Sequence, residues 1–352
     1  MIKWITRLTA VVSLLFLLTL SAGFGYEQWS RYRASQIQPP GKLINVNGKL
    51  SHLYCTGTGS PTVILEAGLN EGGALTWEAA RPAIEQLTRV CAYDQAGIMW
   101  SERRERPRDA NHIAKDLHDL LIAANESPPY IMVGHSAGGP MIRVFTQQFS
   151  NDVAGLVLVD SSHPEQNQRF PKEILEATPF APSLLIRTIS AFGLLRLESP
   201  DPPKELPPQI GKTIRAYLPQ SMTGITDEIE ALDSTFVQAN QTGPFGDMPI
   251  VVLTAGRFAD ELPWQLDAET LANFRAVWSK LWPELQAELT QLSTNTDQRI
   301  ISNSSHNIPL EAPEAVAQAV NDVVTAQRNT MDLEISQQRY NHGKTRRLSV
   351  DS

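Results

Sequence analysis

Short apolar runs separated by turn residues recur along most of the chain and predict the strands of a sheet. The runs are rich in β-branched residues, as strands usually are. They occupy residues 42–46, 49–55, 62–68, 89–97, 130–136, 153–160, 250–256 and 298–305. The Asn47-Gly48 pair between the first two runs is a hairpin signal. We therefore expect eight strands, the first two of which form an antiparallel hairpin.

The later runs are apolar at successive positions, which is typical of strands that are covered on both faces. Stretches with helical periodicity separate the runs, at residues 76–88, 109–124, 139–150 and 311–327. Strands that alternate with helices predict the α/β class, with a mostly parallel sheet and helices on both faces.

One interval breaks this alternation. The 88 residues between Asp160 and Pro249 are too many for a loop in a compact domain. They contain apolar helical patches and the proline-rich stretch PDPPKELPP. We expect a helical cap inserted after the sixth strand. The resulting division is 1–35 as an N-terminal segment, 36–160 as the first part of the core, 161–248 as the cap, 249–328 as the second part of the core and 329–352 as a disordered tail without apolar periodicity.

The N-terminal segment has the pattern of a membrane anchor. The 19 residues from Leu8 to Tyr26 carry no charge, and that length can cross a bilayer. A secretory signal usually has a shorter apolar region, so we favour an anchor over a cleaved signal, although residues 21–23 are an acceptable cleavage site. In both cases the body is exported to a periplasmic or extracellular space. The basic residues around the segment favour an N-terminus on the inner side.

The composition of the chain indicates a globular body and argues against one class of partner. The chain has 42% hydrophobic and 19% charged residues, which suits a globular body. Its net charge of -8 and its lack of a basic stripe with interleaved aromatic residues argue against a nucleic-acid partner. It has two cysteines, Cys55 and Cys91, which are either a pair in an oxidising compartment or two buried thiols.

The strongest chemical signal is Gly134-His135-Ser136-Ala137-Gly138, which fits G-x-S-x-G between an apolar strand and a helix. In such an elbow the serine lies in a strained turn, and flanking glycines remove the Cβ atoms that would clash. The turn exposes the hydroxyl of Ser136 beside a helix N-terminus, which can stabilise negative charge.

A serine hydroxyl needs a general base, and His306 is the candidate. It follows the last predicted strand and stands after the serine in chain order, as in the triads of this elbow. The remaining histidines have weaker cases: His52, His112, His118, His135, His163 and His342. No histidine pair has metal-ligand spacing with supporting ligands, so we predict no metal and no cofactor.

These motifs resemble the α/β-hydrolase fold superfamily. The likeness covers roughly residues 41–328 and is carried by TVILEAGLNEGGALTW, RVCAYDQAGIMWSE, YIMVGHSAGG, GLVLVDSSHPEQ and SSHNIPLEAPEAV. It implies that Ser136 is the nucleophile and His306 the general base, with the backbone N–H groups of Leu69 and Ala137 as the oxyanion hole. The segment around residue 66 departs from the usual His-Gly pattern of the family.

The same resemblance leaves the acidic member of the triad open. Members of the family carry it after the seventh strand, where Asp260 is found, or at the end of the sixth, where Asp160 is found. We favour Asp160 slightly because it is fixed at a strand end. The family topology also makes the second and fourth strands neighbours, which implies that a disulfide can join Cys55 to Cys91.

We therefore expect a metal-independent serine hydrolase that cleaves small-molecule carboxyl esters with a hydrophobic part. A serine at the elbow, in place of an aspartate, argues against epoxide hydrolase and haloalkane dehalogenase chemistry. One alternative is an aminopeptidase for small peptides, which needs an acidic cap residue such as Glu228 or Glu230 facing the amine. The other is a membrane protein that binds hydrophobic ligands without turnover.

Overall fold

The computed structural model describes residues 2–177, 180–197, 203–259 and 266–348 of the chain. Its centre is a single eight-stranded sheet, with the order β1-β2-β4-β3-β5-β6-β7-β8. The strands are β1 Lys42–Val46, β2 Lys49–Thr56, β3 Thr62–Glu66, β4 Val90–Tyr93, β5 Tyr130–His135, β6 Val153–Val159, β7 Ile250–Ala255 and β8 Thr296–Ile301. All eight predicted strands are present, which confirms that part of the sequence analysis.

The sheet is mostly parallel. Strand β2 pairs antiparallel with both β1 and β4, and the pairs from β4 through β8 are parallel. The carboxyl ends of β3, β5, β6, β7 and β8 therefore meet at one edge. In a parallel α/β sheet this edge is where ligands usually bind.

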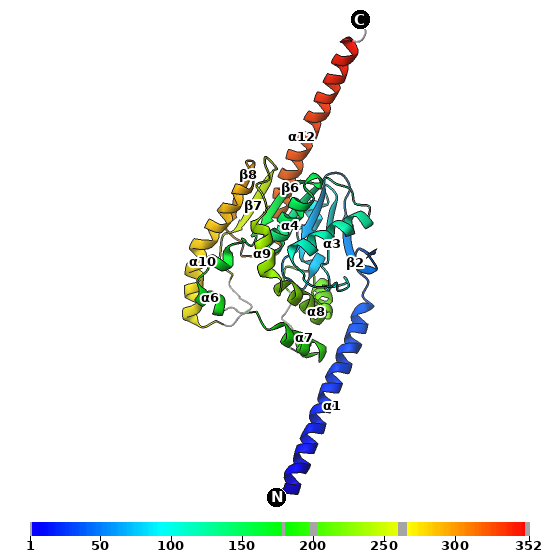
Figure 1. Ribbon diagram of the computed structural model, residues 1–352, viewed down its shortest axis with the longest axis vertical. Helices are drawn as coiled ribbons and strands as arrows, with labels where there is room; N and C mark the ends of the chain where they lie inside the picture. Colours follow the sequence, from blue (N-terminus) through cyan, green and yellow to red (C-terminus); the bar gives the residue numbers. More distant parts are fainter. Residues whose placement is uncertain (1, 178–179, 198–202, 260–265, 349–352) are drawn as a thin grey trace.

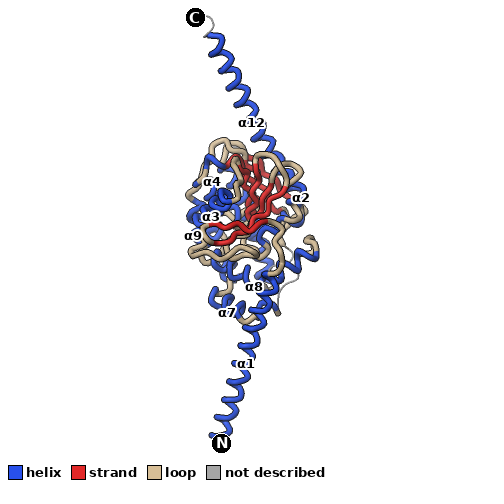
Figure 2. The backbone as a smooth tube through the Cα atoms, turned by 90° about the vertical axis from the view of Figure 1, so that its right-hand side faces the viewer, coloured by secondary structure: helices blue, strands red, loops and turns tan. Residues whose placement is uncertain are grey.

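Helices cover both faces of the sheet (Figures 1 and 2). On one face, α3 Ala110–Ala123, α4 Gly138–Gln148 and α9 Leu232–Asn240 pack on side chains such as Met132 and Leu156. On the other face, α2 Arg81–Ile84 and α12 Pro313–Leu348 pack on side chains such as Val133 and Val157. Neighbouring strand residues thus serve opposite cores, which explains their unbroken apolar runs.

The interval between β6 and β7 is helical. It contains α5 Gln166–Arg169, α6 Lys172–Ala177, α7 Ser183–Ala191, η3 Leu194–Arg196, α8 Pro208–Ile229 and α9. Helix α7 packs on α8, and both lie beyond the sheet on the side from which α1 extends (Figures 1 and 2). Helix α9 instead packs on α3 and α4, next to the sheet.

Three elements differ from the expectation. The predicted helix over 76–88 consists of the short η1 Gly73–Trp77 and of α2, because Pro82 cannot continue an existing helix but fits the first turn of a new one. Helix α10 Ala268–Glu288 was not predicted. Helix α12 continues to Leu348 and so includes residues 329–348, where the sequence analysis predicts a disordered tail.

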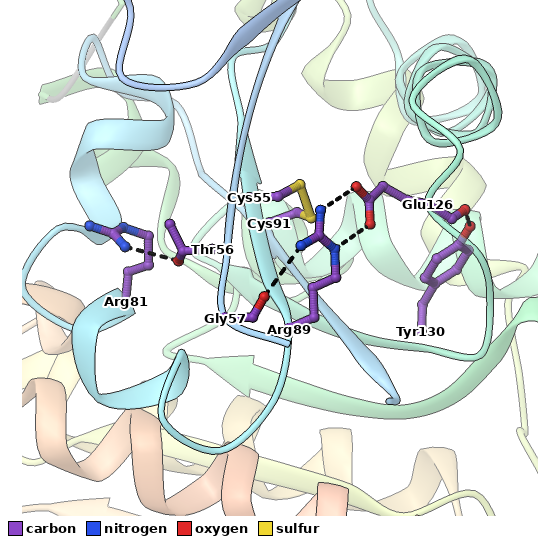
Figure 3. Close-up of a disulfide and its surroundings, with 8 residues drawn as sticks. All are labelled: Cys55, Thr56, Gly57, Arg81, Arg89, Cys91, Glu126 and Tyr130. Atoms are coloured by element: carbon purple, nitrogen blue, oxygen red, sulfur yellow. Dashed lines mark hydrogen bonds and ion pairs between the residues drawn. A yellow bond between two sulfur atoms is a disulfide. The ribbon is translucent and has the colours of Figure 1, made fainter. Parts of the chain in front are cut away.

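Helix α1 Ile2–Ser35 is long and apolar enough to cross a membrane, by length and composition. It extends from the body at the end opposite to α12 (Figures 1 and 2). At the β2–β4 pair, Cys55 lies directly opposite Cys91, and a disulfide joins them. Beside it the Arg89 guanidinium lies between the carboxylate of Glu126 and the carbonyl of Gly57 (Figure 3).

Candidate active site

Ser136 lies at the sharp turn between β5 and α4. Its φ of 55° is in the left-handed region, which strains a residue with a side chain. The turn is so tight that a Cβ on Gly134 would lie 2.7 Å from the Gly138 carbonyl oxygen, and one on Gly138 would lie 2.7 Å from the Glu66 carbonyl oxygen. Both positions therefore require glycine, and the turn lifts the serine hydroxyl above the carboxyl edge of the sheet.

His306 reaches this hydroxyl from the loop after β8. Its Nε2 lies 2.9 Å from Ser136 Oγ, which is hydrogen-bond distance. The His306 side chain is 41% exposed, so one side of the ring faces solvent. Because Nε2 is near the hydroxyl, a neutral imidazole can accept the Ser136 proton when its Nδ1 carries the other proton.

Asp160 holds the other side of the imidazole. Its Oδ2 lies 2.7 Å from His306 Nδ1, and its side chain is 1% exposed. Its Oδ1 accepts two further hydrogen bonds of 2.8 Å, from the Ala255 backbone N–H and from Trp282 Nε1. The carboxylate is thus fixed in an orientation that favours the tautomer with a proton on Nδ1. The other candidate acid, Asp260, lies outside the described residues.

The residues of the two expected oxyanion donors, Ala137 and Leu69, lie near Ser136. Ala137 is the N-cap of α4, so its N–H belongs to the unsatisfied first turn of a helix. Gly68 packs tightly on the elbow, since a Cβ there would lie 2.8 Å from Ser136 Cβ and 3.3 Å from the Ala137 nitrogen. This contact brings Leu69, the next residue, to the cavity that contains Ser136. The positive end of the α4 dipole points to the same place.

Several supporting residues were missed in the sequence. His135 is buried, and its Nε2 donates to the carbonyl oxygen of His306 at 2.8 Å. Burial, reinforced by the neighbouring His306, lowers the pKa of His135 to about 3, so this ring stays neutral at ordinary pH. Glu311 accepts hydrogen bonds from the backbone N–H and the hydroxyl of Ser305, which fixes the loop before His306.

A buried carboxyl group lies beneath the elbow. Glu66, at the end of β3, accepts hydrogen bonds from Tyr93 at 2.5 Å and from Gln95 at 2.7 Å. Burial raises the pKa of Glu66 to about 8, against the lowering effect of these two donors. Its carboxyl group is therefore mostly protonated at neutral pH.

Two connected cavities open at the site. The smaller, of about 110 Å³, is lined by Ser136, His306 and Leu69 among others. The larger has a volume of about 250 Å³. Four residues line both cavities: Asn70, Thr76, Asn307 and Leu310. The far wall of the larger cavity comes from Leu206, Ile214 and Leu218, the last two on α8. The reactive groups thus lie at the end of a cleft with an apolar wall.

The other sequence candidates lie elsewhere. His52 pairs with Asp94 in the interior. On helix α3, His112 pairs with Asp109 and His118 pairs with Asp152. Glu228 is buried near Arg108. Glu230 pairs with Arg106. Among the described residues that line the two cavities, neither of these glutamates is present.

Two groups of side chains in the described ranges have the spacing of metal ligands. One is Cys55, Cys91 and Glu126, but the two cysteines are bonded to each other. The other is His163, Glu165 and Glu288, where Arg169 already binds the Glu288 carboxylate at 2.6 Å. The side chain of His342 is not among the described ones.

Comparisons with known proteins agree with this fold. A family model for the alpha/beta hydrolase fold matches residues 61–185. The uncharacterised protein YqjL of Bacillus subtilis is 24% identical over 287 residues, which cover 80% of this chain and 91% of YqjL. A thermophilic esterase from Thermogutta terrifontis has a TM-score of 0.54 at 20% identity, over 81% of this chain and 97% of the esterase. The epoxide hydrolase CorEH has a TM-score of 0.57 at 18% identity, over 81% and 98%.

Proposed function

We propose that this chain, a member of the α/β-hydrolase fold superfamily, is a serine hydrolase that cleaves carboxyl esters with a hydrophobic part. The observation that supports the proposal most is the continuous chain of contacts from Ser136 Oγ through the His306 imidazole to the Asp160 carboxylate. This order of groups converts a weak hydroxyl nucleophile into a reactive one.

In the first half of the reaction, Ser136 Oγ forms a bond to the ester carbonyl carbon while its proton passes to His306 Nε2. The tetrahedral intermediate collapses as the C–O bond to the alcohol breaks, and the imidazolium gives its proton to the departing oxygen. The Asp160 carboxylate stabilises the imidazolium between these two transfers. The products of this half are an acyl group on Ser136 and a free alcohol.

In the second half, His306 takes a proton from water as the water oxygen attacks the acyl carbon. The bond to Ser136 Oγ breaks, the serine recovers the proton from His306, and the carboxylic acid leaves. The N–H groups of Leu69 and Ala137 would donate to the oxyanion in both halves. Loss of one such donor typically lowers kcat by about 10²–10³-fold.

The apolar part of the cleft supports the proposed substrate class. Leu206, Ile214 and Leu218 form an apolar wall at the larger cavity, suited to a hydrophobic acyl or alcohol part. A serine nucleophile does not fit the aspartate-based opening of epoxides, whatever the activity of some structural neighbours. An aminopeptidase would need an acidic residue of the cap facing the substrate amine, and the burial of Glu228 and the ion pair of Glu230 argue for esters instead. The acidic residue that lines the larger cavity among the described ones, Glu71, lies outside the cap and shares that lining with Arg215.

We further propose that α1 anchors the protein in a membrane, with residues 36–328 on the exported side as a core with a cap at 161–248. A disulfide between Cys55 and Cys91 suits an oxidising compartment. Secretion after cleavage of the N-terminal segment is the alternative. An epitope tag at the C-terminus, tested for access from outside the cell and for the size of the mature chain, distinguishes the two.

The test of activity uses the full-length chain in detergent with p-nitrophenyl butyrate and an aminoacyl p-nitroanilide. We expect hydrolysis of the ester, loss of at least about 10³-fold in kcat for Ser136→Ala, and little change for Ser302→Ala, which alters an exposed serine. Hydrolysis of the anilide alone would favour the aminopeptidase. A folded protein that binds hydrophobic ligands but cleaves neither compound would favour the non-catalytic alternative.

A further inference from the structure

Ion pairs and hydrogen bonds hold the last turns of α1 against the helices between β6 and β7. Glu27 of α1 is fully buried and pairs with Arg196 of η3 at 2.6 Å and with Arg31, one turn further along α1, at 2.6 Å. Arg31 also donates to Ser190 of α7. Arg196 reaches further, to the Ala216 carbonyl of α8. Helix α1 is thus attached to these helices by a buried charge.

The backbones also meet closely at this junction. A Cβ on Gly23 would lie 2.7 Å from the Phe192 carbonyl oxygen, so only glycine permits the contact. A Cβ on Gly193 would lie 3.4 Å from the Tyr26 ring. The turn between α7 and η3 therefore lies against residues 23–27 of α1, and both figures show α7 beside this part of the helix (Figures 1 and 2).

Next to the junction, large apolar side chains are exposed. Helix α7 turns one face to α8, where Arg187 pairs with Asp227 and Ser190 donates to the Pro219 carbonyl. Large apolar side chains of this region remain about half exposed or more. We name five of these residues the α7–η3 surface: Phe180, Leu184, Leu185, Leu194 and Leu197. Leu184 and Leu197 are the most exposed, at 77% and 76%, and the other three are between 49% and 51% exposed.

The level along α1 at which the turn between α7 and η3 packs indicates what covers the α7–η3 surface. The uncharged stretch Leu8–Tyr26 has 19 residues, a rise of about 28 Å in a helix, which matches a bilayer core of about 30 Å. Gly23 is three residues before the end of that stretch, so it lies only about 5 Å inside the apolar layer when α1 crosses it. Interfacial helices bury their apolar face to about 5–10 Å.

The aromatic residues of α1 agree with this depth. Tyr26 ends the uncharged stretch, Trp29 and Tyr32 follow it, and each of the three is about half exposed or more. Tyrosine and tryptophan are enriched at this level of a membrane, between the acyl chains and water. Gly193, between α7 and η3, lies against the first of these three residues.

The cleft lies close to the same junction. Ala34 of α1 belongs to one apolar cluster with Leu206 and Ile214, which line the larger cavity. The Tyr217 hydroxyl, on the same helix as Ile214, donates to the Ala34 carbonyl at 3.0 Å. One apolar cluster therefore connects the end of the anchor with the wall of the cleft.

We propose that the α7–η3 surface inserts into the outer acyl and headgroup boundary of the phospholipid bilayer that α1 crosses, and that the ester reaches Ser136 from this lipid phase. The occupant of the surface is thus the bilayer itself, and the substrate class narrows to esters that partition into it. The insertion of this surface rests on the proposed membrane anchor, and the route of the ester rests in addition on the proposed ester hydrolysis.

The first experiment compares two substrates with the full-length chain reconstituted in phosphatidylcholine vesicles. One is soluble p-nitrophenyl acetate, and the other is a long-chain 4-methylumbelliferyl ester within the vesicles. The variant carries Leu184→Glu and Leu197→Glu, which place charges at exposed positions. The control carries Ile122→Glu and Ile300→Glu, at residues 60% and 65% exposed on α3 and β8.

We expect the variant to keep its activity on the soluble ester within about twofold and to lose at least about tenfold on the vesicle ester, while the control keeps both. Equal activity of variant and wild type on the vesicle ester overturns the lipid route. A wild type that cleaves neither ester contradicts the proposed function and leaves the surface to the second experiment.

The second experiment needs no activity. A benzophenone amino acid replaces Leu197, or replaces Val237 on α9 as a control that is 58% exposed, and the vesicles contain alkyne-tagged phosphatidylcholine. We expect light to join the lipid to position 197 and not to position 237. Crosslinks from position 197 only to a second copy of the chain, or no lipid crosslink there, overturn membrane insertion of this surface.

Discussion

Replacing Trp282 by phenylalanine tests how Asp160 is held. The substitution keeps an aromatic ring in the interior and removes one donor, the indole N–H that reaches Asp160 Oδ1 at 2.8 Å. The Ala255 N–H is then the remaining described donor to that oxygen. Because Asp160 is 1% exposed, water cannot freely replace the lost partner.

The structure sets the size of the effect. A hydrogen bond to a charged group contributes about 1.5–3 kcal/mol, and the smaller ring leaves a gap that costs about 1 kcal/mol more. We therefore expect Trp282→Phe to lower the free energy of unfolding by about 3 kcal/mol. A less fixed carboxylate orients His306 less well, so we expect kcat on p-nitrophenyl butyrate to fall about tenfold. KM should change little, because Trp282 is not among the described residues that line the cleft.

The matched control is Trp278→Phe. Trp278 lies one turn earlier on α10, stacks on Trp282 and makes no hydrogen bond to Asp160 in the described structure. Urea unfolding and steady-state kinetics of both variants decide the matter. If Trp282→Phe matches Trp278→Phe in kcat and in stability, the indole N–H does not position Asp160 and our reasoning about the buried carboxylate fails.

Three further predictions use other residues. Asp160→Asn should lower kcat by about 10⁴-fold with little change in KM, measured by steady-state kinetics, because the amide disfavours the Nδ1–H tautomer; a loss below tenfold would contradict this. The pKa of Glu66 is about 8 in the folded protein, above its ordinary value of 4.5, so the folded state binds this proton more tightly than the unfolded state. The contribution of that proton to the free energy of unfolding is complete below pH 4.5 and is lost as the pH rises to 8. Glu66→Gln should therefore gain stability relative to the wild type by about 1.4 kcal/mol per pH unit over that window in urea unfolding, and parallel pH curves would refute it. Replacing Cys55 and Cys91 together by serine opens a loop with a sequence separation of 36 and should lower the free energy of unfolding by about 4 kcal/mol; an unchanged urea midpoint would show that the disulfide adds nothing.

The parts of the fold with local signals were predictable. Each strand has an apolar run bounded by turn residues, and the elbow has glycines at the two positions where the backbone leaves no room for a Cβ. Ser136 and His306 stand out for the same reason, since each follows a recognisable strand. Their roles stay predictions, although the structure brings the two side chains together.

The acid could not be chosen from the sequence, because its position depends on which strand end faces the imidazole. Asp160 and Asp260 both follow apolar strands, and only the packed sheet brings one of them to 2.7 Å from His306. Trp282 was missed because it comes from α10. That helix has apolar residues one turn apart at Phe274, Trp278 and Trp282, a signal that was present but overlooked.

The attachment of α1 to α7 and η3 has no local signal either. Glu27 and Arg196 are 169 residues apart, and each resembles an ordinary charged surface residue in the sequence. Their burial depends on the close approach of α1 at Gly23, which is a property of the packed molecule. Long-range charge pairs of this kind are not encoded in any window of the sequence.

The central claim is that the Ser136 hydroxyl is a nucleophile activated by His306. The most direct measurement is labelling of the full-length chain with a fluorophosphonate, followed by mass mapping of the labelled peptide. We predict one label on the peptide that contains Ser136, no label in Ser136→Ala, and labelling at least about 10²-fold slower in His306→Ala. A label on another residue, or the same labelling rate without His306, would contradict the account.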